Sequence, residues 1–175
     1  MPDAFTDSLR RNFDTALRML GTALADVPDE LWETDLWPDA PTAARAEGGL
    51  NSSASWFIGY HALTVLDYDL SGDLEPWQPP KPFDENVWAW PARVFTKDEL
   101  TRYVDYCTTR VSTTLDTFDP ERLLPPSHRA HGTSHGVLIS GLPVHTVEHA
   151  AQIRQFLTDQ GRRVRPLPGD QHYKG

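Results

Sequence analysis

The stretch LPVHTVEHAAQIRQF, residues 142–156, decides the fold of this chain. Its apolar residues recur at spacings of three and four, the period of an α-helix that buries one face. The pattern starts near Leu138 and stops at Gly161, so it predicts a helix over residues 135–160. Pro143 lies inside this range and has no backbone N–H, so it either kinks the helix or begins its final segment.

Two positions of the apolar stripe are histidines, His145 and His149. Residues four apart on a helix have Cβ atoms about 5–6 Å apart, so one metal ion can join both imidazoles. A buried imidazole costs free energy unless it is bonded, and a metal ion would satisfy both rings at once. The plainer alternative is that each ring is a core histidine bonded to a neighbouring backbone group or carboxylate.

Three further segments have the helical period, and no segment alternates over a useful length as a strand would. The sequence therefore predicts an all-α four-helix bundle, with long connecting loops that allow a crossover. We expect one domain over 1–175 and a loose C-terminal tail over 162–175. The predicted helices span about 5–27, 52–70, 97–118 and 135–160, with a short helical turn at 29–32.

The starts of two of these helices have recognisable caps. Thr96 and Glu99 form a capping-box pattern before the third helix. Asn51, Ser52 and Ser53 are good N-cap residues for the second helix. Both features support the predicted helix boundaries.

A metal site needs a third ligand, and His61 is the natural candidate because it lies among apolar residues of the second helix. His131 and His135 are also four apart, but they follow His128 in a Gly- and Ser-containing stretch where solvent or a cap can satisfy them. A fourth protein ligand such as His135 would favour a structural site. Three inward histidines on two helices together favour a metal over three separate core histidines.

Composition limits the function further. The formal charge of -9 repels nucleic acid and anionic membranes, and the sequence has no apolar run near the roughly 20 residues of a membrane span. The single Cys107 suits a reducing compartment and cannot build a cysteine metal cluster. We expect a cytoplasmic protein whose metal ligands are His, Asp or Glu.

Several motifs in their order along the chain resemble one known family. They are Ser55-Trp56 leading to His61, Leu66-Asp67-Tyr68-Asp69-Leu70-Ser71-Gly72, and His145-Thr-Val-Glu-His149-Ala-Ala-Gln152-Ile153. Together they resemble the DinB-like family of four-helix bundles with a three-histidine metal site. The resemblance implies that His61, His145 and His149 are the ligands, with Gln152 beside them. It also implies zinc or nickel as the metal, a homodimer, and for some members a low-molecular-weight thiol used in transfer or isomerisation.

Three neutral imidazoles leave a tetrahedral ion one open position, as in catalytic sites, where water or a thiol can bind. Residues 145–149 also read as the H-x-x-E-H signature of inverzincin proteases, so Glu148 is a weak candidate for a general base. Asp67 and Asp69 lie beyond His61, either as acceptors for an imidazole N–H or at a solvated helix end.

Aromatic residues of the second helix and the following loop have two equally good interpretations, a substrate pocket above the metal or core at the end of the bundle. The aromatic residues are Trp56, Tyr60, Trp77, Trp88 and Trp90.

The first functional hypothesis is a metal-dependent enzyme of the DinB-like type, with a small-molecule substrate and a thiol-dependent transfer. The alternatives are a small hydrolase that uses Glu148, and a non-catalytic metal-binding bundle.

Overall fold

The computed structural model describes residues 4–38, 50–72, 76–84, 86, 90–117, 126 and 132–166. Within these residues the protein is all-α, and four helices pack against one another, as the sequence predicts. Every long helix begins and ends within three residues of its predicted bounds. The elements are α1 (Ala4–Asp26), the 3-10 helix η1 (Asp29–Leu31), α2 (Ser55–Ser71), α3 (Lys97–Asp116) and α4 (His135–Asp159).

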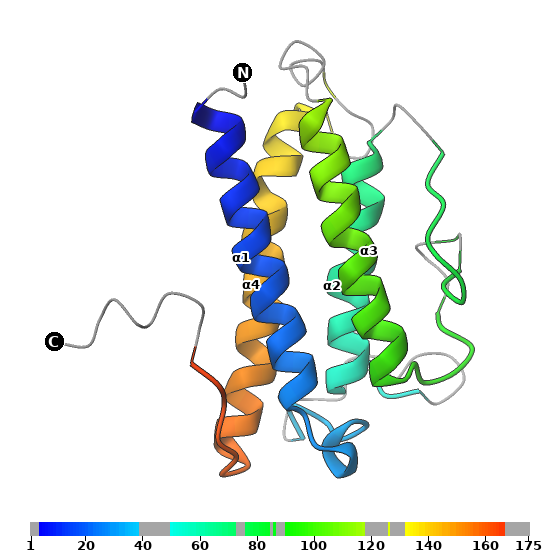
Figure 1. Cartoon of the computed structure of the whole chain (residues 1–175). Coiled ribbons are helices and arrows are strands. Elements are labelled where there is room, and N and C mark those ends of the chain that lie inside the picture. The colour runs from blue at the N-terminus through cyan, green and yellow to red at the C-terminus, as the bar shows by residue number, and fades with distance from the viewer. Residues whose placement is uncertain are drawn as a thin grey trace, which may run out of the picture.

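The four helices form a square bundle with a crossover (Figure 1). Helix α1 packs on α3 and α4, helix α2 packs on the same two helices, and α1 and α2 lie on a diagonal. In Figure 1, α1 and α4 run downward, whereas α2 and α3 run upward. Because α2 and α3 are parallel neighbours, the chain between residues 72 and 96 has to return along the bundle, which is the crossover that the long connection allows.

The core is built from the predicted stripes. Leu17 and Leu20 of α1 and Leu63 and Leu66 of α2 are almost completely buried, and Ile153 of α4 is completely buried. Removing this apolar surface from water is the main stabilising contribution to the fold. None of the helices that the structure describes is both long and apolar enough to cross a bilayer.

The helix caps confirm one prediction and correct another. At α3, the Thr96 side chain accepts from the Glu99 backbone N–H, and the Glu99 carboxylate accepts from the Thr96 backbone N–H, which is the predicted capping box. At α2 the N-cap is Ala54, without a side-chain hydrogen bond, so the predicted caps at 51–53 are wrong. These polar side chains bond within the loop instead, since Ser53 donates its hydroxyl and its N–H to Asn51 Oδ1.

Helix α4 is continuous across Pro143. The proline therefore lies inside the helix and does not begin a separate segment. Its missing N–H leaves the Ile139 carbonyl without its usual i+4 donor. One turn further on, the Thr146 hydroxyl donates to the Leu142 carbonyl at 2.9 Å, a side-chain bond within the helix that does not replace the one missing at Ile139.

The first residues of the C-terminal tail lie against the end of α1 and against η1. Arg165 donates from its backbone N–H to Asp26 at 3.1 Å and forms an ion pair with the same carboxylate. Arg162 pairs with Glu30 of η1 at 2.8 Å. The predicted loose tail is thus fastened over 162–166, and residues 167–175 lie outside the described part of the chain.

Candidate metal centre

The three histidines predicted as ligands lie together between α2 and α4. One ring nitrogen from each of His61, His145 and His149 lies within 4.8 Å of the other two. His145 and His149 are one turn apart on α4, with ring centroids separated by 4.4 Å. His61 faces them from the antiparallel α2, at 5.4 Å from the His145 centroid and 5.1 Å from the His149 centroid.

The cluster fits a single metal ion after a small contraction. An ion with tetrahedral nitrogen ligands at about 2.0–2.1 Å holds those nitrogens about 3.3 Å apart. The Nε2 atoms of His145 and His149 are already 3.0 Å apart. Two bare imidazole lone pairs repel at this distance, so the contact requires a proton or a cation between them. The ring nitrogen of His61 lies within 4.8 Å of the other two, so the third side has to shorten when an ion binds.

Gln152 orients one of the three rings. Its side-chain oxygen accepts from His149 Nδ1–H at 2.8 Å. With the proton held on Nδ1, the Nε2 lone pair of His149 points toward the cluster, as a metal ligand requires. His145 has no such support, because its Nδ1 is buried without a hydrogen-bond partner among the described residues. Gln152 therefore fixes the tautomer and the orientation of the His149 ring, as hydrogen-bond acceptors do behind most metal-binding histidines.

Electrostatics keep two of the rings neutral. The pKa of His61 is lowered to about 4, first by burial and then by the charges that His149 and His145 would carry. The pKa of His145 is also lowered to about 4, by burial and by His149. At neutral pH both rings are therefore uncharged and keep a lone pair available for a cation. All three histidines are partly buried, so each keeps some exposure to solvent.

Glu148, the candidate general base, is exposed on α4. Adjacent residues on a helix point about 100° apart, so the Glu148 side chain leaves the helix in a different direction from the imidazole of His149. A general base has to lie within hydrogen-bond reach of the reacting group. Glu148 is three residues after His145 and therefore on a neighbouring part of the helix surface. Its carboxylate is nevertheless not among the described ligand atoms that converge, which come from the three histidines.

Asp67 is fully buried, so of the two alternatives for this residue the solvated helix end is wrong. Its Oδ2 accepts from Trp77 Nε1 at 2.8 Å and from the Tyr103 hydroxyl at 3.2 Å. The Oδ1 atom lies 3.6 Å from Arg110 Nε. Burial raises the pKa of Asp67, while these donors and the guanidinium act in the opposite direction. The described bonds of this carboxylate fasten α3 and the crossover segment to α2 and do not reach the imidazole of His61.

His135 is 6% exposed, which corrects the prediction of an exposed loop histidine. Its Nε2 pairs with the Asp69 carbonyl oxygen at 2.9 Å, where the start of α4 meets the end of α2. The ring lies so close to Gly72 that a Cβ there would be 2.4 Å from His135 Cε1. His135 is not part of the three-histidine cluster. His128 and His131 lie outside the described residues.

Three of the predicted aromatic residues are core, and one is exposed. Trp90 is different from the buried ones, because it is 42% exposed and its ring packs on Phe57 with centroids 5.3 Å apart. Sequence reasoning missed Phe57, although its position four residues before His61 was a usable signal. Trp88 lies outside the described residues. The aromatic residues that form core are Trp56, Tyr60 and Trp77.

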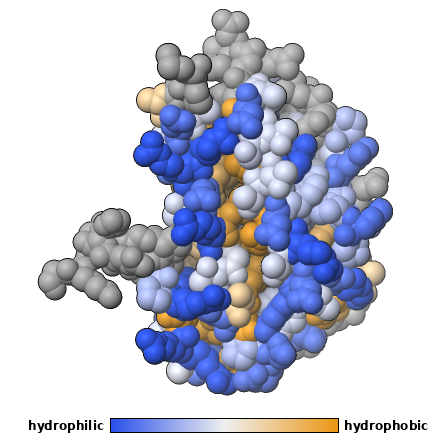
Figure 2. All heavy atoms as spheres, in the orientation of Figure 1, coloured by the Kyte–Doolittle hydropathy of each residue, from blue (hydrophilic) through white to orange (hydrophobic). Residues whose placement is uncertain are grey.

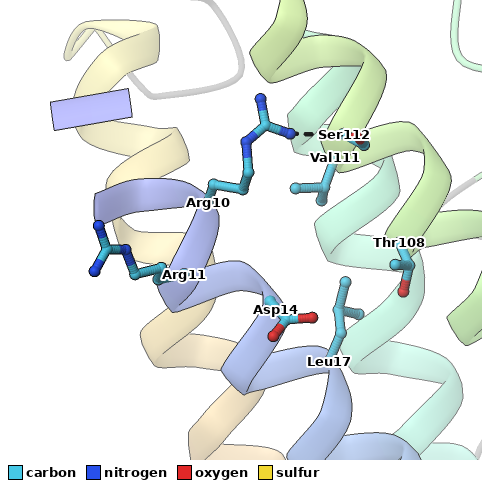
Figure 3. Close-up of a pocket in the computed structure, with 7 residues that line it drawn as sticks. All are labelled: Arg10, Arg11, Asp14, Leu17, Thr108, Val111 and Ser112. Atoms are coloured by element: carbon cyan, nitrogen blue, oxygen red, sulfur yellow. Dashed lines mark hydrogen bonds between the residues drawn. The ribbon is translucent and has the colours of Figure 1, made fainter. Parts of the chain in front are cut away.

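A separate groove lies between α1 and α3, on the face toward the viewer in Figure 2, where apolar side chains show between two rows of hydrophilic ones. Its volume is about 320 Å³. Figure 3 shows Arg10 reaching toward Ser112, to which it donates at 3.2 Å, while Arg11 points away. None of the three clustered histidines lines this groove. Its lining residues are Arg10, Arg11, Asp14, Leu17, Thr108, Val111 and Ser112.

Comparison of the chain with protein-family models, curated proteins and solved structures found no match in any of the three. The class of protein is therefore defined by the fold and the candidate site alone. It is a four-helix all-α protein with a three-histidine cluster that can hold a metal ion.

Proposed function

We propose that His61, His145 and His149 hold one divalent metal ion, and that the protein is a metal-dependent enzyme of the DinB-like type. The observation that carries this proposal is the convergence of three ring nitrogens within 4.8 Å from two separate helices. A cation shared by three partly buried imidazoles satisfies their converging ring nitrogens at once. A divalent cation is the partner that three neutral imidazoles suit best.

The family assignment is supported by the arrangement of the site and not only by its composition. One ligand comes from α2 and two come from α4, in the order in which the resemblance places them. Gln152 stands beside His149 through a 2.8 Å hydrogen bond, in the position that the resemblance also implies. The resemblance favours zinc or nickel as the metal, and imidazole ligands suit both.

The donor set supports a catalytic centre more than a closed structural one. Structural zinc sites have four protein ligands, whereas catalytic sites have three and keep one position for water or substrate. When bound, the ion acts as a Lewis acid and lowers the pKa of a water or thiol in that position. We propose a thiol-dependent transfer to a small molecule as the reaction, in a homodimeric cytoplasmic protein. The hydrolase that uses Glu148 is the weaker candidate because that side chain is exposed.

Metal content tests the proposal directly. Tag-free protein, purified without chelator, should contain about one equivalent of metal per chain by plasma mass spectrometry. The His149→Ala variant should lose it. His135→Gln is the matched control, because it removes another buried histidine of α4 that is not in the cluster, and it should keep the metal while folded. Wild-type protein without metal would contradict the proposal.

A second assay separates transfer from hydrolysis. The metal-loaded protein is incubated with low-molecular-weight thiols and electrophilic acceptors, and the loss of free thiol is followed over time. Thiol consumption that depends on the metal and disappears in His149→Ala supports transfer. Ester or amide hydrolysis without any thiol, lost in Glu148→Gln, would favour the hydrolase. Sedimentation velocity decides between a monomer and the proposed homodimer.

A further inference from the structure

An aromatic surface lies one helical turn from the histidine cluster. Phe57 is four residues before His61 on α2, so both side chains leave the same face of the helix. Trp90, from the segment that returns from α2 to α3, packs on Phe57 with an interplanar angle of 31°. Trp90 is 42% exposed, and Phe57 is partly buried beneath it. The pair therefore presents an accessible aromatic surface directly beside His61.

On α4 the side chain one turn before His145 is absent. Gly141 is four residues before His145, and it is exposed. A Cβ at Gly141 would meet no atom within 4 Å, so no described neighbour requires a glycine there. Glycine inside a helix is unfavourable relative to alanine. Because α2 and α4 are antiparallel, Phe57 and Gly141 lie on opposite sides of the cluster along the bundle.

The α2 side of the cluster is bordered by apolar residues. Phe57 and Val65, four residues before and four residues after His61, are both partly buried on the same face of the helix. With Trp90 packed on Phe57, they give this side of the cluster an apolar border. Small-molecule sites combine such surface with a few polar groups that fix the orientation of the ligand. Here the polar element is the histidine cluster itself.

We infer that the Phe57–Trp90 pair is the specificity surface of this site, and that it selects small substrates with a flat apolar body and one metal-binding head such as a thiol. The inference rests on the proposed metal site. In this arrangement the head reaches the three histidines, and the flat body stacks on the exposed face of Trp90. Aromatic pairs in offset-stacked or edge-to-face contact gain stabilisation beyond the area that they bury, and a saturated ring of similar size lacks this gain because it has no π-system.

Two thiols with the same head group test the inference. Cobalt-loaded, tag-free protein is titrated with benzyl mercaptan and with cyclohexylmethanethiol, and binding is followed through the cobalt absorption bands. The wild-type protein should bind the aromatic thiol about tenfold more tightly, since a tenfold ratio corresponds to about 1.4 kcal/mol, the upper part of the range for an aromatic contact. Phe57→Leu and Trp90→Ala should each bring this ratio close to one.

The chain offers a matched control for Trp90. Trp37 is 43% exposed at a place distant in sequence from both helices of the cluster, and Trp37→Ala should keep the wild-type ratio. A ratio that neither Phe57→Leu nor Trp90→Ala changes would overturn this inference while the metal site stands. Protein that takes up no cobalt would overturn the proposed function, and this inference with it.

Discussion

Replacing Gln152 with alanine tests how the candidate site is organised. The side chain contributes one hydrogen bond to the cluster, in which its oxygen accepts from His149 Nδ1–H at 2.8 Å. Without it, His149 can rotate and can move its proton to Nε2, the atom that faces His145. Loss of such an acceptor behind a metal-binding histidine typically weakens metal binding about 10–100-fold. That change corresponds to about 1.4–2.7 kcal/mol of binding free energy.

The assay is a zinc competition titration against a chromophoric chelator at pH 7.5, with thermal unfolding measured in parallel. Gln152→Glu should retain wild-type affinity or exceed it, because an acceptor oxygen remains and gains a charge. Gln155→Ala is the matched control, since Gln155 is exposed on the same helix and bonds to Asp159. An unchanged zinc affinity in folded Gln152→Ala would refute the reasoning.

Three other predictions concern stability. Gly72→Ala should lower the free energy of unfolding by about 1–3 kcal/mol. Gly72 has φ 60°, and the Cβ of an alanine there would lie 2.4 Å from the His135 ring. A wild-type urea midpoint would contradict this. Asp67→Ala should cost about 2–4 kcal/mol in the same assay, since it leaves two buried donors without their acceptor and the partly buried Arg110 guanidinium without its carboxylate. A loss below about 1 kcal/mol would speak against it. Metal-free protein should lose stability as pH falls from about 6.5 toward about 4. Burial lowers the pKa of His61 and His145 to about 4 in the folded protein, so the unfolded chain binds more protons in that pH window. Thermal midpoints that stay constant over the window would contradict this.

The sequence predicts the helices well because their apolar residues recur with the helical period over four to six turns. The sequence predicts the start of α2 a few residues too early, since Asn51 and Ser53 are good caps in isolation. The local pattern does not reveal that these side chains bond to each other inside the loop. Competing local hydrogen bonds of this kind are the usual reason that helix boundaries predicted from sequence shift by a few residues.

The candidate site was less predictable where its contacts come from distant parts of the chain. Spacing alone brings His145 and His149 together, but the position of His61 opposite them depends on how α2 packs on α4. The buried carboxylate of Asp67 is bonded by Trp77 and Tyr103, which are 10 and 36 residues away, and no periodic pattern in the sequence predicts these contacts. His135 is buried for a similar reason, because the end of α2 covers it.

The most direct test of the central claim is a crystal structure of the metal-loaded protein, with anomalous diffraction recorded on both sides of the absorption edge of the bound metal. The account predicts one anomalous peak between α2 and α4, about 2.0–2.1 Å from a ring nitrogen of each of His61, His145 and His149, with a non-protein ligand in the remaining position. A peak at another group of residues, or no peak in protein that was loaded with zinc or nickel, would contradict it.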